Sequence, residues 1–175
     1  MNTLKDLPPD LDPAEAATKR FPEITAFFSS ATPLSNFYQT NITIDNHSYH
    51  SVEQFFQLEK AKFAEDLSAV SQIRKATHPA ECKKIGDKVK LNFQNWLPKA
   101  KTVLMKGCRA KFTQDERAKA FLLGTGDTTL AEATHNKTWG VGLPLNDKDL
   151  EIKEKWTGQN VVGIILTDLR NEMKL

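Results

Sequence analysis

The chain has 175 residues, a net charge of +2 and a pI near 8.5. Its length is that of one domain with its own core, and so mild a charge does not by itself argue for a nucleic-acid partner. No apolar run approaches the ~18 residues of a transmembrane helix, and the N-terminus lacks a signal-peptide pattern. We therefore expect an intracellular protein, cytoplasmic or nuclear, with no membrane partner and monomeric by default.

The two cysteines, Cys82 and Cys108, stand far apart in the chain. They belong to no CxxC or Cys/His spacing that would hold zinc. We therefore predict no metal site and reduced thiols, as is usual in the cytosol or nucleus.

The first 24 residues hold four of the eight prolines and five acidic residues. Such a segment has little apolar surface to bury, so residues 1–24 are expected to be a flexible arm. Within it, Asp12 and Pro13 predict the start of a helical turn or two running to Arg20. Residues 25–175 are expected to form a single domain.

The domain begins with a short β-rich run, Ile24–Phe28. Two more short apolar segments, 42–44 and 48–49, flank Asp45-Asn46 and predict a β-hairpin. After this point the pattern is helical, with predicted helices over 52–63, from Asp66 to Lys75, from Pro79 to about Gly86, and over 97–112, 118–123 and 161–173. The expected fold class is mainly α, multihelical, with a small antiparallel β element near the N-terminus.

The helix over 52–63 carries a polar stripe. Ser51 followed by Gln54 is a capping-box signature, which places the helix start at Val52. Glu53, Gln57 and Lys60 then fall at i, i+4 and i+7, on one face of the helix. The stripe fits a small-molecule pocket, or equally the solvated edge of an ordinary amphipathic helix, and periodicity alone favours the second reading.

Glycine is concentrated late in the chain, where seven of the eight glycines follow residue 100. The Gly124-Thr125-Gly126 and Trp139-Gly140-Val141-Gly142 segments permit the close backbone approach that phosphate or ribose contacts use. Trp139 beside Glu132 suggests a platform for a flat base. A core tryptophan at an ordinary turn explains the same pattern equally well.

Taken together, these segments resemble the NADAR (YbiA-like) domain family. The resemblance covers about residues 26–173 and keeps the family's order of motifs: Leu34-Ser35-Asn36-Phe37, Ser51–Gln57 with Lys60-Ala61, Lys111-Phe112, Leu122–Gly126, Leu130–Ala133, Trp139–Gly142 and Gly158–Gly163 with Leu169-Arg170. No single segment is decisive, but so many in the same order are hard to obtain by chance.

The resemblance implies a multihelical N-glycosidase without a metal or organic cofactor. One activity of the family is removal of ADP-ribose from ADP-ribosylated guanine in DNA or RNA, which reverses DNA ADP-ribosylation. The other is cleavage of riboflavin-pathway ribosylamino-pyrimidine phosphates, which are free nucleotide-like substrates. A third reading, from another class, is a non-catalytic ADP-ribose or NAD-binding module.

Breaking an N-glycosidic bond requires an acid for the leaving nitrogen and a nucleophile or activated water for C1′. Glu53 matches the family glutamate as acid or base. Lys60 is expected to stabilise negative charge or attack the opened sugar as an amine, although a lysine extending into solvent is the simpler alternative. Glu132 is the second candidate carboxylate. These three residues are the predicted catalytic group.

The predicted substrate-binding residues lie on several segments: Ser35, Asn36, Phe37, Gln57, Trp96, Thr125, Asn136, Trp139, Gly140, Gly142 and Asn160. Trp96 is expected to form a wall of the pocket or stack on a base, with a core role as the alternative. Asn160, as N-cap of the last helix, and the amides beside it suggest a pyrophosphate seat.

One position departs from the family pattern. Asn136 stands three residues before Trp139, where the family usually has aspartate, and the loop is one residue shorter. Asparagine keeps hydrogen-bonding capacity but cannot act as an ionised base. Either the role of this position is structural and Asn136 fulfils it, or catalysis is weakened here.

Overall fold

The computed structural model describes residues 12–175, and the contacts within the chain define two compact units. Residues 36–120 form one unit, here called the helical unit. Residues 12–35 together with residues 121–175 form the other, here called the sheet unit. The boundary at residue 120 falls within α6 (Glu116–Leu123). The helices predominate throughout, which confirms the predicted mainly-α class.

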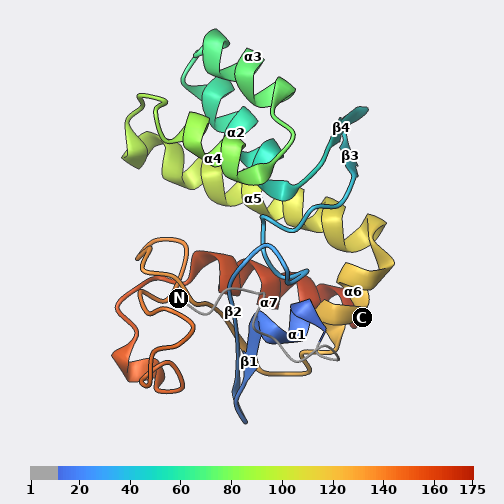
Figure 1. Cartoon of the computed structure of the whole chain (residues 1–175), viewed down its shortest axis with the longest axis vertical. Coiled ribbons are helices and arrows are strands. Elements are labelled where there is room, and N and C mark those ends of the chain that lie inside the picture. The colour runs from blue at the N-terminus through green and yellow to red at the C-terminus, as the bar shows by residue number, and fades with distance from the viewer. Residues whose placement is uncertain (1–11) are drawn as a thin grey trace. The chain divides into compact units, whose positions relative to one another are not determined.

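The helical unit is organised around α2 (Val52–Phe63). This helix packs against its three successors, α3 (Leu67–Lys75), α4 (Pro79–Gly86) and α5 (Phe93–Gln114) (Figure 1). Buried side chains of all four helices form the core between them, among them Phe55, Leu58, Ile73, Cys82, Trp96 and Leu104. Because α2 is central, most of its length is buried, including side chains that the sequence pattern places on a polar stripe.

The start of α2 is set by side chains rather than by propensity. Ser51 Oγ accepts a hydrogen bond from the Gln54 amide at 3.1 Å, as the capping signature predicts. The Gln54 side chain reaches back one residue further than in the usual capping box, and its Oε1 accepts from the His50 amide at 2.9 Å. These bonds fix the first turn, where Glu53 lies.

The predicted hairpin is confirmed as β3 (Ile42–Ile44) and β4 (His47–Tyr49). Asp45 and Asn46 both have positive φ, +51° and +63°, which is the backbone of a type I′ turn. The Gln114 side chain at the end of α5 completes the free edge of β3, because it bonds both the amide and the carbonyl of Thr43 at 2.8 Å.

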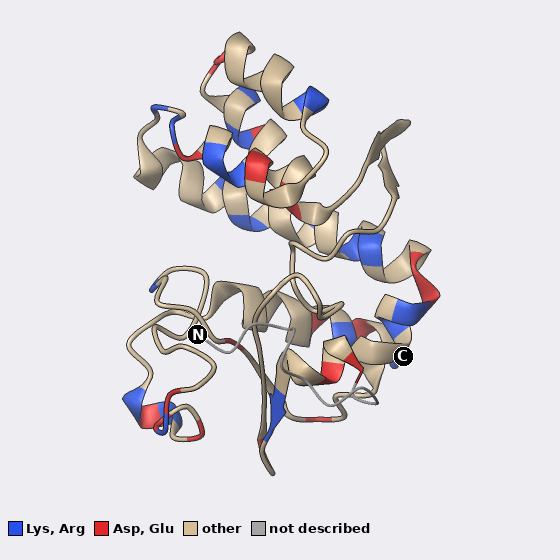
Figure 2. Cartoon of the chain, viewed as in Figure 1, with Lys and Arg blue, Asp and Glu red and all other residues tan. Residues whose placement is uncertain are grey.

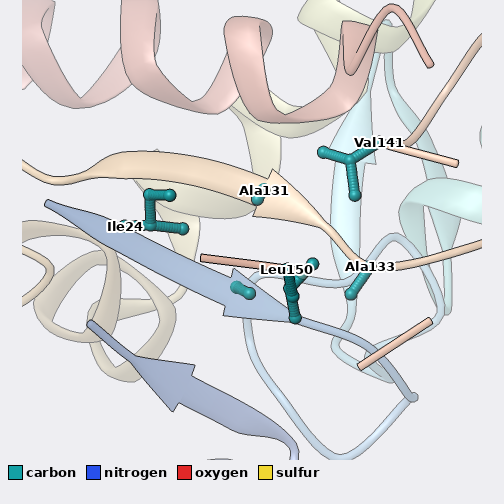
Figure 3. Packing of buried hydrophobic residues seen from close by; sticks show 6 residues of the cluster. Ile24, Ala131, Ala133, Val141 and Leu150 are labelled. Atoms are coloured by element: carbon teal, nitrogen blue, oxygen red, sulfur yellow. The ribbon is translucent and has the colours of Figure 1, made fainter. Parts of the chain in front are cut away.

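The sheet unit contains a three-stranded mixed sheet in the order β1 (Thr18–Arg20), β2 (Ile24–Phe27), β5 (Thr129–Glu132). β1 and β2 are antiparallel, whereas β2 and β5 are parallel, with Phe27 opposite Glu132. α7 (Val161–Met173) packs against β5, and a 3-10 turn, η2 (Lys153–Lys155), precedes it along the chain. Small and aliphatic side chains form the core beside the sheet: Ile24, Ala26, Ala131, Ala133, Val141 and Leu150 (Figure 3).

The expectation of a flexible arm through residue 24 is wrong for its described part. α1 (Pro13–Ala16) is capped by Asp12, as predicted, but β1 follows it and pairs with β2. Ala14 and Ala17 are buried, and Thr18 Oγ1 donates to the Ala14 carbonyl. Composition alone did not reveal β1, because this strand is stabilised by pairing with β2, which follows after a turn. Residues 1–11 of the predicted arm lie outside the described residues.

Two further elements differ from the prediction. β5 has no local signal, because its four residues acquire their partner strand about 100 residues away in the chain. α5 begins at Phe93 instead of Leu97, since Asn92 Oδ1 caps it by accepting from the amides of Gln94 and Asn95. Both differences arise at positions where a partner, rather than hydrophobic periodicity, defines the boundary.

Asn160 joins α7 to β5. It stands at the predicted N-cap position, but its side chain makes no cap bond and its φ is +52°. Instead, its Nδ2 donates to the Leu130 carbonyl at 2.8 Å and its Oδ1 accepts from the Glu132 amide at 3.1 Å. The side chain therefore completes the edge of β5 and orients the backbone of Glu132.

We expect Asn160→Ala to lower the free energy of unfolding by about 2–4 kcal/mol, because it removes one buried and one partly buried hydrogen bond and leaves an alanine in the left-handed region. Asn160→Gly, which tolerates the positive φ, should cost about 1 kcal/mol less. Chemical denaturation measures both, with the exposed Asn171→Ala in the same helix as control. Equal losses for Asn160→Ala and Asn171→Ala would contradict the bridging role.

Candidate active site

The predicted polar stripe of α2 is buried. The Glu53 side chain is only 5% exposed, and its Oε1 accepts a hydrogen bond from Gln57 Nε2 at 2.8 Å. Its backbone amide, one of the donors that a helix start leaves unpaired, donates to the Asn36 carbonyl at 3.0 Å. A solvated edge, the alternative that periodicity favours, is therefore excluded for Glu53 and Gln57.

Lys60 completes this cluster from the next turn of α2. Its Nζ donates to the carbonyl of Gly86 at 2.8 Å, and Gly86 is the last residue of α4. The Lys60 side chain is half-buried. The ammonium group is therefore anchored on the protein instead of extending freely into solvent. The structure thus brings Glu53, Gln57 and Lys60 together with a residue that the sequence pattern did not single out, Gly86.

Burial controls the ionisation of both charged groups. It raises the pKa of the Glu53 carboxyl from 4.5 to about 7, against the smaller lowering effects of the Gln57 hydrogen bond and of Lys83 and Lys60. Burial likewise lowers the pKa of Lys60, which the carboxylate of Asp87 partly offsets. A carboxyl group that is partly protonated at neutral pH can deliver a proton to a leaving group, as general acid catalysis requires.

Trp96 has the core role that the sequence left as the alternative. It is 1% exposed and lies against Phe56 and Phe63, with ring centroids 5.7 and 5.3 Å away. An indole enclosed in this way supports α2 from α5 and does not offer a face to a base. Because Phe56 and Phe63 both belong to α2, this packing helps to bury that helix.

The predicted Ser35, Asn36 and Phe37 stand at the boundary between the units. Ser35 is buried at the end of the first segment of the sheet unit, and its amide donates to the Thr32 carbonyl. Asn36 begins the helical unit, where its carbonyl holds the Glu53 amide and its Oδ1 accepts from the Cys108 thiol at 3.5 Å. Asn36 is thus a positioning residue for α2, and Phe37 beside it is half-buried.

The other predicted residues lie in the sheet unit. Glu132 ends β5, half-buried, with its amide held by Asn160 and its carbonyl accepting from the Val141 amide at 2.9 Å. The Asn136 side chain closes an Asx turn, because Oδ1 accepts from the amides of Thr138 and Trp139 at 2.9 Å each. An aspartate carboxylate would accept the same two bonds, so the departure from the family pattern preserves the shape of this loop.

The glycines of this loop serve packing. A Cβ on Gly140 would lie 2.5 Å from the Glu132 carbonyl, and Gly142 has a φ of +83°. The loop is joined to the start of α7 by a series of backbone bonds, in which Val161 and Val162 donate to the carbonyls of Thr138 and Trp139. Those amides are consequently not available to a pyrophosphate, and the predicted seat at this helix N-terminus is wrong for them.

Thr125 has a structural partner too. Its buried hydroxyl donates to the Leu122 carbonyl and accepts from Arg170 Nη1 at 2.8 Å. Burial lowers the pKa of the Arg170 guanidinium, which is 2% exposed. Together, Thr125 and Arg170 tie the turn after α6 to α7.

Sequence reasoning gave no role to two buried cations, Arg170 and Lys111. Lys111 is fully buried in α5, with its Nζ 4.5 Å from the centroid of the Phe112 ring. A signal was present in the sequence: Lys111 continues the apolar face of Leu104 and Cys108 at helical spacing, as Arg170 does after Leu166. A basic residue on a buried helix face is seldom tolerated without a partner or a function.

One hollow of the sheet unit is lined by none of the predicted site residues. A hollow of about 610 Å³ lies in the sheet unit, lined by Lys19, Phe28, Ala133, Thr134, His135, Pro144, Leu145 and Asn146. Within residues 12–175, no group of three or more His, Cys, Asp and Glu side chains is arranged to hold a metal ion. None of the helices in this range has the length and apolar character that crossing a membrane requires.

Comparison with known proteins matches the chain to one family. The NADAR domain family profile matches residues 24–174, which is most of the chain. The chain belongs to the NADAR domain family. The family includes N-glycosidases. The buried carboxyl group on α2 is suited to this type of reaction, which needs an acid.

Relatives from distant organisms share this domain. Protein irg-1 of Caenorhabditis elegans is 30% identical, with 91% of this chain and 82% of that protein aligned. The N-glycosidase YbiA of Escherichia coli is also 30% identical, over 81% of each chain. The NMR structure of E. coli YbiA has a TM-score of 0.70 and 26% identity, and covers 93% of this chain and 91% of that one. The NADAR fold and N-glycosidase activity are therefore properties of this chain.

Substitution of the buried carboxyl should change how stability depends on pH. The pKa of Glu53 is higher folded than unfolded, so its contribution is fully present below about pH 4.5 and lost as pH rises through about 7. Glu53→Gln should match wild type at pH 4.5 and be more stable by about 3 kcal/mol above pH 8.

Chemical denaturation at pH 4.5, 6 and 8.5 measures this difference. Glu59→Gln is the matched control in the same helix, because its carboxylate pairs with Lys62 at the surface, and its difference should stay within about 0.5 kcal/mol. A Glu53→Gln difference that does not grow with pH would show that the carboxyl is not held in its neutral form.

Proposed function

We propose that this N-glycosidase hydrolyses the bond between ADP-ribose and guanine in nucleic acid, and so reverses guanine ADP-ribosylation. The observation that carries the proposal is the buried Glu53 carboxyl, whose pKa is raised to about 7. A carboxyl with this pKa holds its proton at neutral pH in a large fraction of molecules. It can therefore protonate a poor nitrogen leaving group without requiring an acidic medium.

In the proposed reaction, Glu53 donates its proton to the guanine nitrogen as the bond from that nitrogen to the ribose C1″ breaks. The electron pair of the bond goes to the base, and C1″ acquires oxocarbenium character. A water molecule adds to C1″ and gives up one proton, which returns to the Glu53 carboxylate. ADP-ribose and unmodified guanine are the products, and the acid is restored.

Gln57 and Lys60 assist from the same stripe. Gln57 donates to one oxygen of Glu53, which leaves the other oxygen to carry the proton. Lys60, whose pKa burial lowers, supplies an amine that has a larger neutral fraction than an exposed lysine. It is assigned to charge stabilisation or to attack on the opened sugar aldehyde. Glu132 stays a predicted catalytic carboxylate of the sheet unit, and the proposed reaction assigns it no step.

The charge of the helical unit supports a nucleic-acid substrate over a small phosphate ester. Residues 36–120 contain fifteen Lys and Arg against nine Asp and Glu, a net charge of +6, whereas the rest of the chain is at −4. The overall value of +2 conceals this separation. Lys and Arg recur along α4 and α5 (Figure 2), and a polyanion gains more from an extended basic surface than a single phosphate does. Such a substrate places the enzyme in the cytoplasm or the nucleus, where it is proposed to act as a monomer.

The direct test is release of ADP-ribose from an oligonucleotide that carries ADP-ribosylated guanine. Wild type should release it, Glu53→Gln should lose activity by at least about 100-fold, and Glu59→Gln in the same helix should keep the wild-type rate. Release by wild type that Glu53→Gln leaves unchanged would overturn the role of Glu53.

Two parallel measurements separate the alternatives. Turnover of ribosylamino-pyrimidine phosphates, with no release from the oligonucleotide, would assign the enzyme to riboflavin-pathway intermediates. Calorimetric binding of ADP-ribose without turnover of either substrate would identify a binding module. The Asx turn of Asn136 removes one argument for the module, because that side chain's bonds do not require a base.

Salt should weaken the reaction of a nucleic-acid substrate in a defined way. For single strands, log kcat/KM should fall linearly with log salt concentration, with a slope of about −0.7 per phosphate contact. Lys84→Ala and Lys88→Ala, which remove exposed charges of the helical unit, should each make the slope less negative by up to about 0.7. Lys148→Ala and Lys153→Ala, exposed in the sheet unit, are the matched controls. Equal effects of all four variants would remove the helical unit from the proposed interface.

A further inference from the structure

Gly86 contacts two residues of the polar stripe of α2, Gln57 and Lys60. It ends α4, and the backbone there is an ordinary right-handed helix, which any residue adopts. Space is what excludes a side chain: a Cβ at this position would lie 1.8 Å from Gln57 Oε1 and 2.5 Å from its Cδ. The Gln57 amide thus occupies the volume that a side chain at position 86 would fill.

The same glycine contacts the other end of the stripe through its backbone. Its carbonyl accepts from Lys60 Nζ at 2.8 Å, while the Gln57 amide packed on its Cα donates to Glu53 Oε1 at 2.8 Å. One residue of α4 therefore contacts the two other side chains of the stripe, Gln57 and Lys60. α2 and α4 are packed along their length, so this contact is fixed by the helix pair itself.

The orientation of Gln57 has a cost that indicates a function. Its Oε1 is buried, and within the described residues no hydrogen-bond donor reaches it. A buried polar atom without a partner disfavours the folded state, and such atoms are kept where they serve a purpose. Here the purpose is served by the other branch of the amide, whose N–H is directed at the Glu53 carboxyl.

We propose that Gly86 is a positioning residue of the active site: its missing side chain seats the Gln57 amide against Glu53, and its carbonyl holds Lys60. The role in catalysis rests on the proposed function of Glu53 as the acid. The positioning itself is a property of the helical unit, which can be measured without any substrate.

Gly86→Ala tests the proposal with little risk to folding. Alanine is favoured over glycine within a helix, and the atoms that it would meet are the far end of a flexible side chain, so Gln57 swings away from Glu53. Loss of that hydrogen bond should raise the pKa of Glu53 above about 7, because the bond lowers it. NMR titration of the Glu53 carboxyl carbon measures the shift, and kcat should fall by about 10- to 100-fold.

Gly107→Ala is the matched control in the same unit. A Cβ there would lie 3.0 Å from Val52 Cγ1 and 3.1 Å from Phe55 Cδ1, so it tests tight packing on α2 without touching Gln57. It should leave the pH titration of the Glu53 carboxyl unchanged, and the melting temperature records the effect of the tight packing alone. If both variants move the titration equally, or neither moves it, Gly86 has only a packing role.

A double variant decides whether Gly86 acts through Gln57. Gln57→Ala should raise the pKa of Glu53 as Gly86→Ala does, and combining the two should add nothing further, because both remove the same bond. Additive shifts would overturn the proposed route. If wild type proves inactive on every substrate while these titration results hold, the proposed function fails and the positioning role of Gly86 stands.

Discussion

The burial of the Glu53 carboxyl group in the first turn of α2 is the constraint on which the chemistry of the helical unit depends. A helix N-terminus favours a negative charge by about 0.3–1 kcal/mol, and Gln57 donates a hydrogen bond that favours it further. Desolvation opposes both, and the net rise of the pKa to about 7 corresponds to roughly 3 kcal/mol against ionisation. Burial therefore decides the protonation state of this group, and the packing of α3, α4 and α5 on α2 decides its burial.

The neighbours of Glu53 are arranged so that each fixes one part of it. Ser51 fixes the start of the helix, the Asn36 carbonyl holds the Glu53 amide, and Gln57 holds one carboxyl oxygen. Trp96 packs from α5 against Phe56 and Phe63 of α2. A side chain restrained at backbone and carboxyl alike loses little further freedom when it acts, which is how a site contributes to rate through geometry.

The loops of the sheet unit are used differently from what their composition suggests. Glycine-rich segments near a helix start are typical of phosphate sites, but here the amides of Val161 and Val162 are bonded to the loop that contains Gly140. Asn160 and Asn136 likewise use their side chains on backbone groups. These residues form a rigid frame around the end of β5, where Glu132 lies.

The sequence by itself determined the features that depend on neighbours in the chain. The start of α2, the hairpin at Asp45-Asn46 and the helix over 161–173 follow from caps, turn residues and periodicity, and the order of motifs determined the family. Only the tertiary structure decided that Glu53 and Gln57 are buried, that Gly86 contacts both Gln57 and Lys60, and that Trp96 is a core residue. The tertiary structure also decided the existence of strand β5 and the packing of residues 12–24. The physical reason is that desolvation, strand pairing and the space beside a glycine are set by segments brought together from distant parts of the chain, and hydrophobic periodicity carries no record of them.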